Sequence, residues 1–297
     1  MSHRWAAPRR NEVSDEGAAS SDLEGNSAIS SVNPWVREAS LAVGLVVLLL
    51  GSMWISTGSF PPMVVVESQS MMHHEEGSIG AIDPGDLILV MNKERVDIVS
   101  FVEATQEGNE HYGYESHGMP GDVIIYRKNG GQDTPVIHRA LLEVVANGTG
   151  WDVPGTSLRN VENITWTLED YECSSVHGGY KLRVMNWEPE HSGFLTSGDN
   201  NYGGCMIDQP SANRGPGSGL VDARGNPVEP ILDEWVVGVA SSEIPWIGTI
   251  KLATSGTSGS VTAKSWYSLT FTILAILLSP IAVESISGWN PDNDEEE

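Results

Sequence analysis

Two long apolar runs stand near the two ends of the chain. The first, Ala39–Thr57, carries no charge and has roughly the 20 residues that a transmembrane helix needs. The second, Trp266–Val283, opens with two aromatic residues of the kind found at membrane interfaces, and its proline is tolerated in such helices. These runs predict transmembrane helices over residues 38–58 and 265–284.

The residues between these runs follow a β pattern. Short runs rich in Val and Ile alternate with clusters of Gly, Pro, Asn and Asp, which is typical of antiparallel strands and their turns. We therefore expect a mainly β domain, an antiparallel sheet or barrel, over residues 59–264, with loop excursions at 93–120 and 210–230. The expected strands are Val64–Val66, Asp86–Val90, Val96–Val102, Asp122–Arg127, Val136–Val145, Phe194–Thr196 and Trp235–Val239.

The polar ends of the chain indicate its orientation. Residues 1–37 show no apolar period, which predicts a disordered tail, and residues 285–297 form an acidic tail. Arginines that precede the first apolar run favour a cytoplasmic N-terminus. Two crossings then return the C-terminus to the same side and leave the β domain outside the cell membrane. The long polar leader argues against a cleavable signal peptide at the first run.

Charge and cysteine content exclude some classes of protein. Among 297 residues, Lys and Arg total 16 against 40 Asp and Glu, a net charge of -24, so binding to nucleic acid is not expected. Hydrophobic residues make up 40% of the chain, enough for a core, and the acidic bias with more arginine than lysine indicates adaptation to concentrated salt. Cys173 and Cys205 are too few for a disulfide framework; one bridge and two unpaired thiols both stay open.

The predicted β domain holds candidates for a serine-based catalytic set. Ser70 follows the predicted strand Val64–Val66, and His138 stands in an otherwise apolar strand. Asp199 and Asp208 follow a later strand. A serine nucleophile needs a base to take its proton and usually a third group to orient that base. Each residue alone also fits a structural role, because serine and Gly-Asp-Asn are common in turns and a lone strand histidine is often partly buried.

Other histidines offer weaker alternatives. His73 and His74 lie within four residues of Ser70 and compete for the role of base, but they fall in a predicted loop. A further group of aromatic and histidine residues lies in the excursion at 93–120: His111, Tyr112, Tyr114 and His117. Loop histidines in such a Gly- and Glu-rich segment are usually solvated, so we predict no metal site.

Four motifs come in a fixed order behind the first apolar run. They are Ser70-Met71, then Gly121-Asp122-Val-Ile-Ile-Tyr126, then Val136-Ile137-His138-Arg139, and finally Gly198-Asp199-Asn200-Asn201 with Asp208 further on. In this order they resemble the type I signal peptidases. The likeness covers residues 40–145, and 190–250 in outline.

Two details narrow the resemblance. The stretch Ser78–Val90 is similar to the archaeal branch of that family. The residue before Arg139 is His138, as in archaeal and endoplasmic-reticulum enzymes, whereas bacterial enzymes carry a lysine there. Together with the acidic composition, the resemblance implies a Ser–His enzyme from a halophilic archaeon.

The resemblance implies a role for each matching residue. Ser70 is the nucleophile, and His138 is the general base and later the acid. Asp208 orients the histidine and Asp199 shapes the turn. The gap between the Gly-Asp-Asn-Asn turn and the second aspartate is longer in this chain than in the family, so both aspartates stay open for the orienting role. The backbone N–H of Ser70, with the hydroxyl of Ser68, forms the oxyanion hole.

The function implied by the resemblance is that of a serine endopeptidase. It would cleave signal peptides from exported preproteins on the outer face of the membrane, through an acyl-enzyme intermediate and without a cofactor. An extended substrate could add to the edge of the strand made by Val64, Val65, Val66 and Glu67. Membrane lipid and a component of the export machinery are further expected partners. Two alternatives stay open: an inactive or scaffolding domain of the same fold, and a peptidase for another class of membrane-anchored precursors.

Two tripeptides match the acceptor pattern for N-glycosylation. They are Asn147-Gly148-Thr149 and Asn163-Ile164-Thr165. Both agree with an outer location of the β domain, but tripeptides of this kind are frequent by chance.

Overall fold

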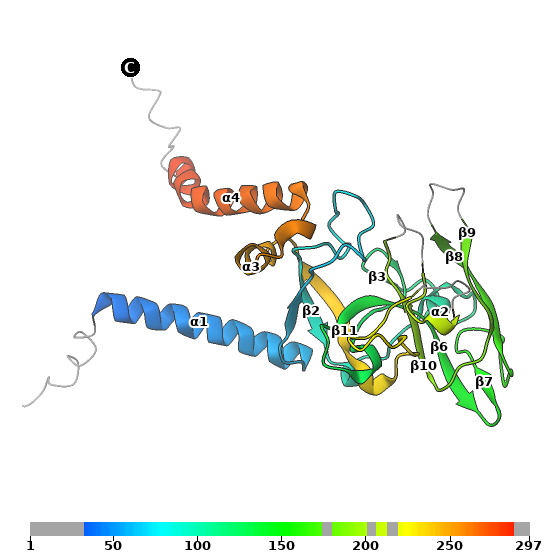
Figure 1. Cartoon of the computed structure of the whole chain (residues 1–297). Helices are drawn as coiled ribbons and strands as arrows, with labels where there is room; N and C mark the ends of the chain where they lie inside the picture. The colour runs from blue at the N-terminus through cyan, green and yellow to red at the C-terminus, as the bar shows by residue number, and fades with distance from the viewer. Residues whose placement is uncertain (1–32, 174–179, 201–205, 213–218, 288–297) are drawn as a thin grey trace, which may run out of the picture. The chain divides into compact units, whose positions relative to one another are not determined.

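The structure, a computed structural model, describes most of the chain between the two tails (Figure 1). The described stretches are 33–173, 180–200, 206–212 and 219–287. By its contacts the chain divides into two units, one up to Leu49 and one from Leu50 onward. Most of both predicted tails, and Cys205 of the cysteine pair, lie outside the described residues.

The described chain consists mainly of strands with one long helix near each end. The helices are α1 (Pro34–Thr57), α2 (Phe101–Thr105), α3 (Thr249–Ser255) and α4 (Ala263–Ser287). The strands are β1 (Met63–Val65), β2 (Leu87–Met91), β3 (Glu115–Ser116), β4 (Met119–Pro120), β5 (Val123–Tyr126), β6 (Val136–Asn147), β7 (Gly150–Asp152), β8 (Ile164–Cys173), β9 (Tyr180–Trp187), β10 (Gly193–Ser197) and β11 (Val236–Ile244).

Helix α1 begins earlier than the polar pattern predicts. The side chain of Asn33 accepts a hydrogen bond from the N–H of Trp35 at 3.1 Å, as an N-cap does. Pro34 takes the first helical position, where no intrahelical partner exists for an N–H. Residues 34–37 are therefore helical, although the sequence predicts a tail up to residue 37.

Both terminal helices are long and apolar enough to cross a membrane. The candidate spans, Pro34–Thr57 and Ala263–Glu284, have mean hydropathies of 2.1 and 1.8. Within the described chain, 0% and 6% of these windows are buried, which is unlike the core helix of a soluble domain. They coincide with the predicted spans to within a few residues.

The main sheet is antiparallel and open. Its strand order is β1-β2-β11-β5-β6-β10, with β7 paired to β6. All the predicted strands except Val96–Val102 lie in this sheet, with shifted ends. Because β1 and β10 do not pair with each other among the described strands, the sheet does not close into the barrel that was the alternative in the sequence prediction.

The prediction of a strand over Val96–Val102 is wrong, because the cap of a helix forms within this run. The hydroxyl of Ser100 accepts from the N–H of Glu103, and the Glu103 carboxylate accepts from the N–H of Ser100. This capping box starts α2 at Phe101, inside the β-branched run. The excursion at 93–120 is thus partly ordered, since it contains α2 and the short β3–β4 pair.

The hairpin of β8 and β9 forms a separate two-stranded sheet that the sequence pattern does not predict. Apolar residues do alternate at the start of β8, but charges and a register shift between Leu168 and Glu172 interrupt the pattern. The hairpin is held by its buried side, where Leu168, Tyr171 and Trp187 join the largest core cluster. In the excursion at 210–230, the described residues form a short 3₁₀ turn and an isolated bridge.

Candidate active site

Ser70 lies in a turn just beyond β1, and its neighbours anchor it to the core. Val66 and Met71 on either side are almost fully buried, in a cluster with Ile82 and Ile88. The turn is also tied to the end of β10: the N–H of Asn200 donates to the Ser70 carbonyl at 2.8 Å. This anchoring holds the serine at one place on the domain although the turn itself is irregular.

His138 stands on β6, opposite Ile124 of β5, and is a buried residue, 7% exposed. Its Nδ1 atom lies 2.6 Å from Oδ2 of Asp208. Asp208 is positioned by its own backbone, because its N–H donates to the Thr196 carbonyl on β10 at 2.8 Å. The structure therefore pairs the histidine with Asp208 and not with Asp199.

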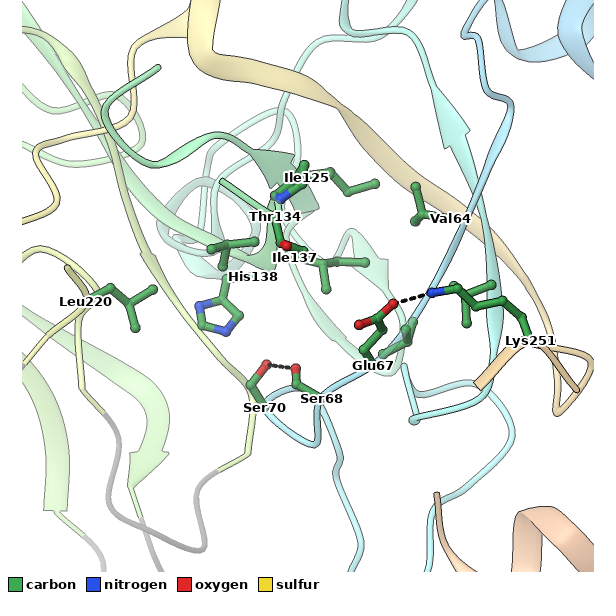
Figure 2. A pocket seen from close by; sticks show the side chains of 14 residues that line it. Val64, Glu67, Ser68, Ser70, Ile125, Thr134, Ile137, His138, Leu220 and Lys251 are labelled. Carbon is green, nitrogen blue, oxygen red and sulfur yellow. Dashed lines mark hydrogen bonds and ion pairs between the residues drawn. The ribbon is translucent and has the colours of Figure 1, made fainter. Parts of the chain in front are cut away.

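The side chains of Ser70 and His138 face the same small space (Figure 2). Gly198 borders it: a Cβ built on this glycine would lie 3.1 Å from His138 Nε2 and 3.2 Å from Ser70 Cβ. Among the described residues, the Ser70 hydroxyl is hydrogen bonded to the Ser68 hydroxyl, at 3.1 Å, and not to the imidazole. A change of the serine rotamer is the movement that would turn the hydroxyl to the imidazole.

Two further hydroxyl groups share the carboxylate oxygen that contacts His138. Tyr126 donates to Asp208 Oδ2 at 2.8 Å, and Thr196 donates to the same atom at 2.7 Å. These bonds hold the carboxylate in one orientation while it faces the imidazole. Tyr126 belongs to one of the four sequence motifs but has no expected role there. The signal in the sequence is a polar group at the end of an apolar strand, and such a group needs a hydrogen-bond partner when the strand is buried.

The environment of His138 favours its protonated form. Burial alone lowers its pKa, but the charge and hydrogen bond of Asp208, with the charge of Asp199, outweigh burial, and the pKa is raised above its ordinary 6.5. An imidazole with such a partner accepts a proton readily at Nε2. This is the property that a general base needs.

Asp199 belongs to a different network behind the serine. Its carboxylate makes a two-pronged contact with Arg139, with Nε and Nη2 donating at 2.9 Å and 2.6 Å, and it contacts His73 Nε2 at 3.1 Å. Both Arg139 and Asp199 are buried, and the guanidinium charge helps to hold the pKa of this carboxyl below its usual value although burial raises it. His73 thus lies against Asp199, and His74 is exposed.

An apolar groove of about 570 Å³ leads to the serine (Figure 2). Its walls come from the end of β1, from β5 and from the start of β6, with Ser70 and His138 at one end and the Glu67–Lys251 ion pair at the other. The volume falls in the range of ligand sites in proteins.

The open edge of β1 borders this groove. Val66 donates to the Asp86 carbonyl and the Pro62 carbonyl accepts from Val90, so alternate residues of this strand bond inward to β2. Because hydrogen-bonded pairs alternate along an antiparallel ladder, Val65 turns its N–H and C=O outward. The described chain has no strand beyond β1, so an extended peptide can pair there.

The Ser70 N–H is also available as a donor, because no described residue accepts from it. The Ser68 hydroxyl contacts the hydroxyl of the same residue, Ser70, at 3.1 Å. The oxyanion hole expected from the Ser70 N–H and the Ser68 hydroxyl stays a prediction.

The histidines of the 93–120 excursion do not form a cluster. His111 faces Glu110 at 3.4 Å, whereas Tyr114 donates to Asp122 at 2.7 Å. Among the described residues, no group of three or more His, Cys, Asp or Glu side chains could hold a metal ion.

No model of a known protein family matches the chain, and no curated protein matches its sequence.

Proposed function

We propose that this chain is a membrane-bound serine endopeptidase of the signal-peptidase type, which cleaves signal peptides from exported preproteins outside the membrane. The observation that supports this most directly is the convergence at Gly198: Ser70 and His138 Nε2 border one space, and Asp208 lies on the other side of the same imidazole. This is the arrangement of nucleophile, base and orienting carboxylate that acyl transfer by serine requires.

The proposed reaction runs through an acyl-enzyme. The Ser70 hydroxyl turns from Ser68 and passes its proton to His138 Nε2 as its oxygen attacks the substrate carbonyl. Asp208 stabilises the imidazolium through Nδ1. The Ser70 N–H and the Ser68 hydroxyl donate to the oxyanion. The imidazolium then protonates the leaving amine, and water repeats the cycle to release the new carboxylate.

The substrate proposal follows from the groove and from its place in the chain. An extended peptide would pair with Val65 at the open edge of β1. Such pairing recognises the backbone of the peptide rather than its side chains. The apolar walls would take small uncharged side chains next to the cleaved bond. Thr57, the last residue of α1, is about 13 residues from Ser70, at most about 45 Å of extended chain, so cleavage would occur close to the membrane.

A second candidate is supported by one observation. The Ser70 hydroxyl is hydrogen bonded to Ser68 and not to His138, as it could be in an inactive domain that kept the fold. Replacing Ser68 by Ala distinguishes an active peptidase from an inactive domain. In a peptidase it removes an oxyanion donor and lowers kcat by about 10²- to 10³-fold, with KM little changed. An inactive domain cleaves no preprotein, either with or without this substitution.

The test uses the purified full chain in detergent at high salt with a synthetic preprotein, and the cleavage site is mapped by mass spectrometry. We expect one cut after the signal peptide, lost in Ser70→Ala and in His138→Ala while both proteins accumulate normally. Cleavage by the Ser70→Ala protein, or its absence in the wild type, would reject the proposal. Cleavage of other membrane-anchored precursors in the same panel, but not of signal peptides, would support the other precursor class.

A further inference from the structure

The hairpin that joins β6 to β7 carries an acceptor tripeptide at its tip. Asn147 pairs with Gly150, so Gly148 and Thr149 form the turn, and all three tripeptide residues are exposed. Gly148 has a φ of +64° and a Cβ built on it would meet nothing within 4 Å. In Figure 1 the hairpin lies at the end of the β domain away from α3 and α4. An enzyme can therefore reach the tripeptide without opening the sheet.

We propose that Asn147 is a site of N-linked glycosylation. The amide nitrogen of Asn147 would form a bond to the anomeric carbon of an oligosaccharide carried on a lipid phosphate. The bond from that carbon to the phosphate oxygen breaks, the lipid phosphate leaves with the electron pair, and the amide nitrogen loses one proton. The proposal rests on the outward orientation proposed above and not on the peptidase activity.

The local contacts of Asn147 are compatible with a glycan. Its Nδ2 atom donates to both carboxylate oxygens of Asp152, each at 3.1 Å. A glycosylated amide keeps one N–H, so one of these bonds can persist. The carboxylate also keeps the N–H of Asn160 at 2.7 Å. The hairpin therefore does not depend on an unmodified amide.

The second tripeptide provides an internal control, because it runs into the paired strand β8, although Asn163 and Thr165 are themselves exposed. Ile164, its middle residue, is fully buried and pairs with Trp187 across the β8–β9 hairpin. The Thr165 hydroxyl is bonded to Asn186 through both the side chain (3.2 Å) and the backbone N–H (2.9 Å). The tripeptide at Asn147 thus lies in a hairpin turn, whereas the one at Asn163 is fixed by strand pairing and by the contacts of Thr165, so we expect modification at Asn147.

The test is made on the full chain purified from the membranes of a host that glycosylates asparagine. Peptides are released with an amidase in heavy-oxygen water, which marks each formerly glycosylated asparagine by mass. We expect the mark at Asn147 and not at Asn163. The glycan-dependent gel shift should disappear in Asn147→Gln and Thr149→Ala, and remain in Thr149→Ser and Asn163→Gln.

Three outcomes would overturn the proposal. The first is an unmarked Asn147 in the wild-type protein, which needs no variant and hence no folding control. The second is a gel shift that depends on Asn163 instead. The third is protection of the hairpin from protease added outside sealed cells, which would reject the orientation as well. Preprotein cleavage by Asn147→Gln is measured in parallel and should be unchanged, since the hairpin is not part of the groove.

Discussion

His138 Nδ1 lies 2.6 Å from Asp208 Oδ2, and Tyr126 and Thr196 hold that same oxygen in place. The imidazole is therefore held at its Nδ1 atom, and its Nε2 atom faces the space that it shares with Ser70. Asp199, nine residues earlier and directly in the Gly-Asp-Asn turn, instead neutralises a buried arginine. The two aspartates consequently have separable effects on activity and on stability.

Replacing Asp208 by Asn should reduce kcat by roughly 10⁴-fold, the loss seen for a histidine-orienting aspartate in a serine peptidase. The amide cannot stabilise the imidazolium and can favour the wrong tautomer. The measurement is preprotein cleavage alongside the unfolding midpoint. Asp199→Asn is the matched control, expected to lower stability more than kcat. A larger loss of kcat in Asp199→Asn, with the protein folded, would move the orienting role to Asp199.

The acid side of the pH profile should lie above pH 6.5. His138 must be neutral to accept the serine proton, and its pKa is raised. We expect kcat/KM to fall as pH drops through that raised pKa. A fall that begins only below pH 6.5 would contradict the raised pKa of His138.

The same raised pKa predicts the opposite trend for stability. The contribution of His138 to the free energy of unfolding is fully present below the pKa of the unfolded chain and is lost as pH rises through the folded pKa. Unfolding of the inactive Ser70→Ala protein, followed from pH 6 upward, measures this loss. The matched His138→Gln protein should lack that component of the pH dependence. An identical pH dependence in both proteins would speak against the shift.

Gly198→Ala should lower the cleavage rate strongly without unfolding the protein. The added Cβ would lie 2.5 Å from the Ser70 carbonyl oxygen and 3.1 Å from His138 Nε2, so the serine turn must shift. A displacement on this scale costs about 100-fold in rate. Gly259→Ala is the control, because a Cβ there meets nothing within 4 Å. Wild-type cleavage by Gly198→Ala would show that the space between serine and histidine is larger than described.

Arg139→Met should destabilise the domain by about 3–5 kcal/mol, since it leaves the buried Asp199 carboxylate without its main partner. The guanidinium also donates to the Met119 and Pro120 carbonyls, which would lose a donor. The free energy of unfolding is measured in denaturant at constant salt. The double variant Arg139→Met/Asp199→Leu should recover part of the loss, because no buried charge remains. Equal stability of the single variant and the wild type would contradict a structural role for the pair.

The sequence by itself determined the elements whose pattern is local. The apolar runs predict α1 and α4, and the β-branched runs between turn residues predict most strands of the main sheet. It also selected Ser70 and His138 as candidates through their order in the chain. Where a local cap competed with the β pattern, at Ser100, the prediction was wrong. The β8–β9 hairpin was missed because its charged residues interrupt the alternation.

Only the tertiary structure decided which aspartate faces the histidine. Both aspartates follow β10 and both are buried, so neither spacing nor residue type separates them. The pairing depends on the register of β5 against β6 and on the backbone bond from Asp208 to Thr196, which bring Tyr126, His138 and Asp208 to one point. Contacts of this kind join residues far apart in the chain, and their geometry exists only once the sheet has formed.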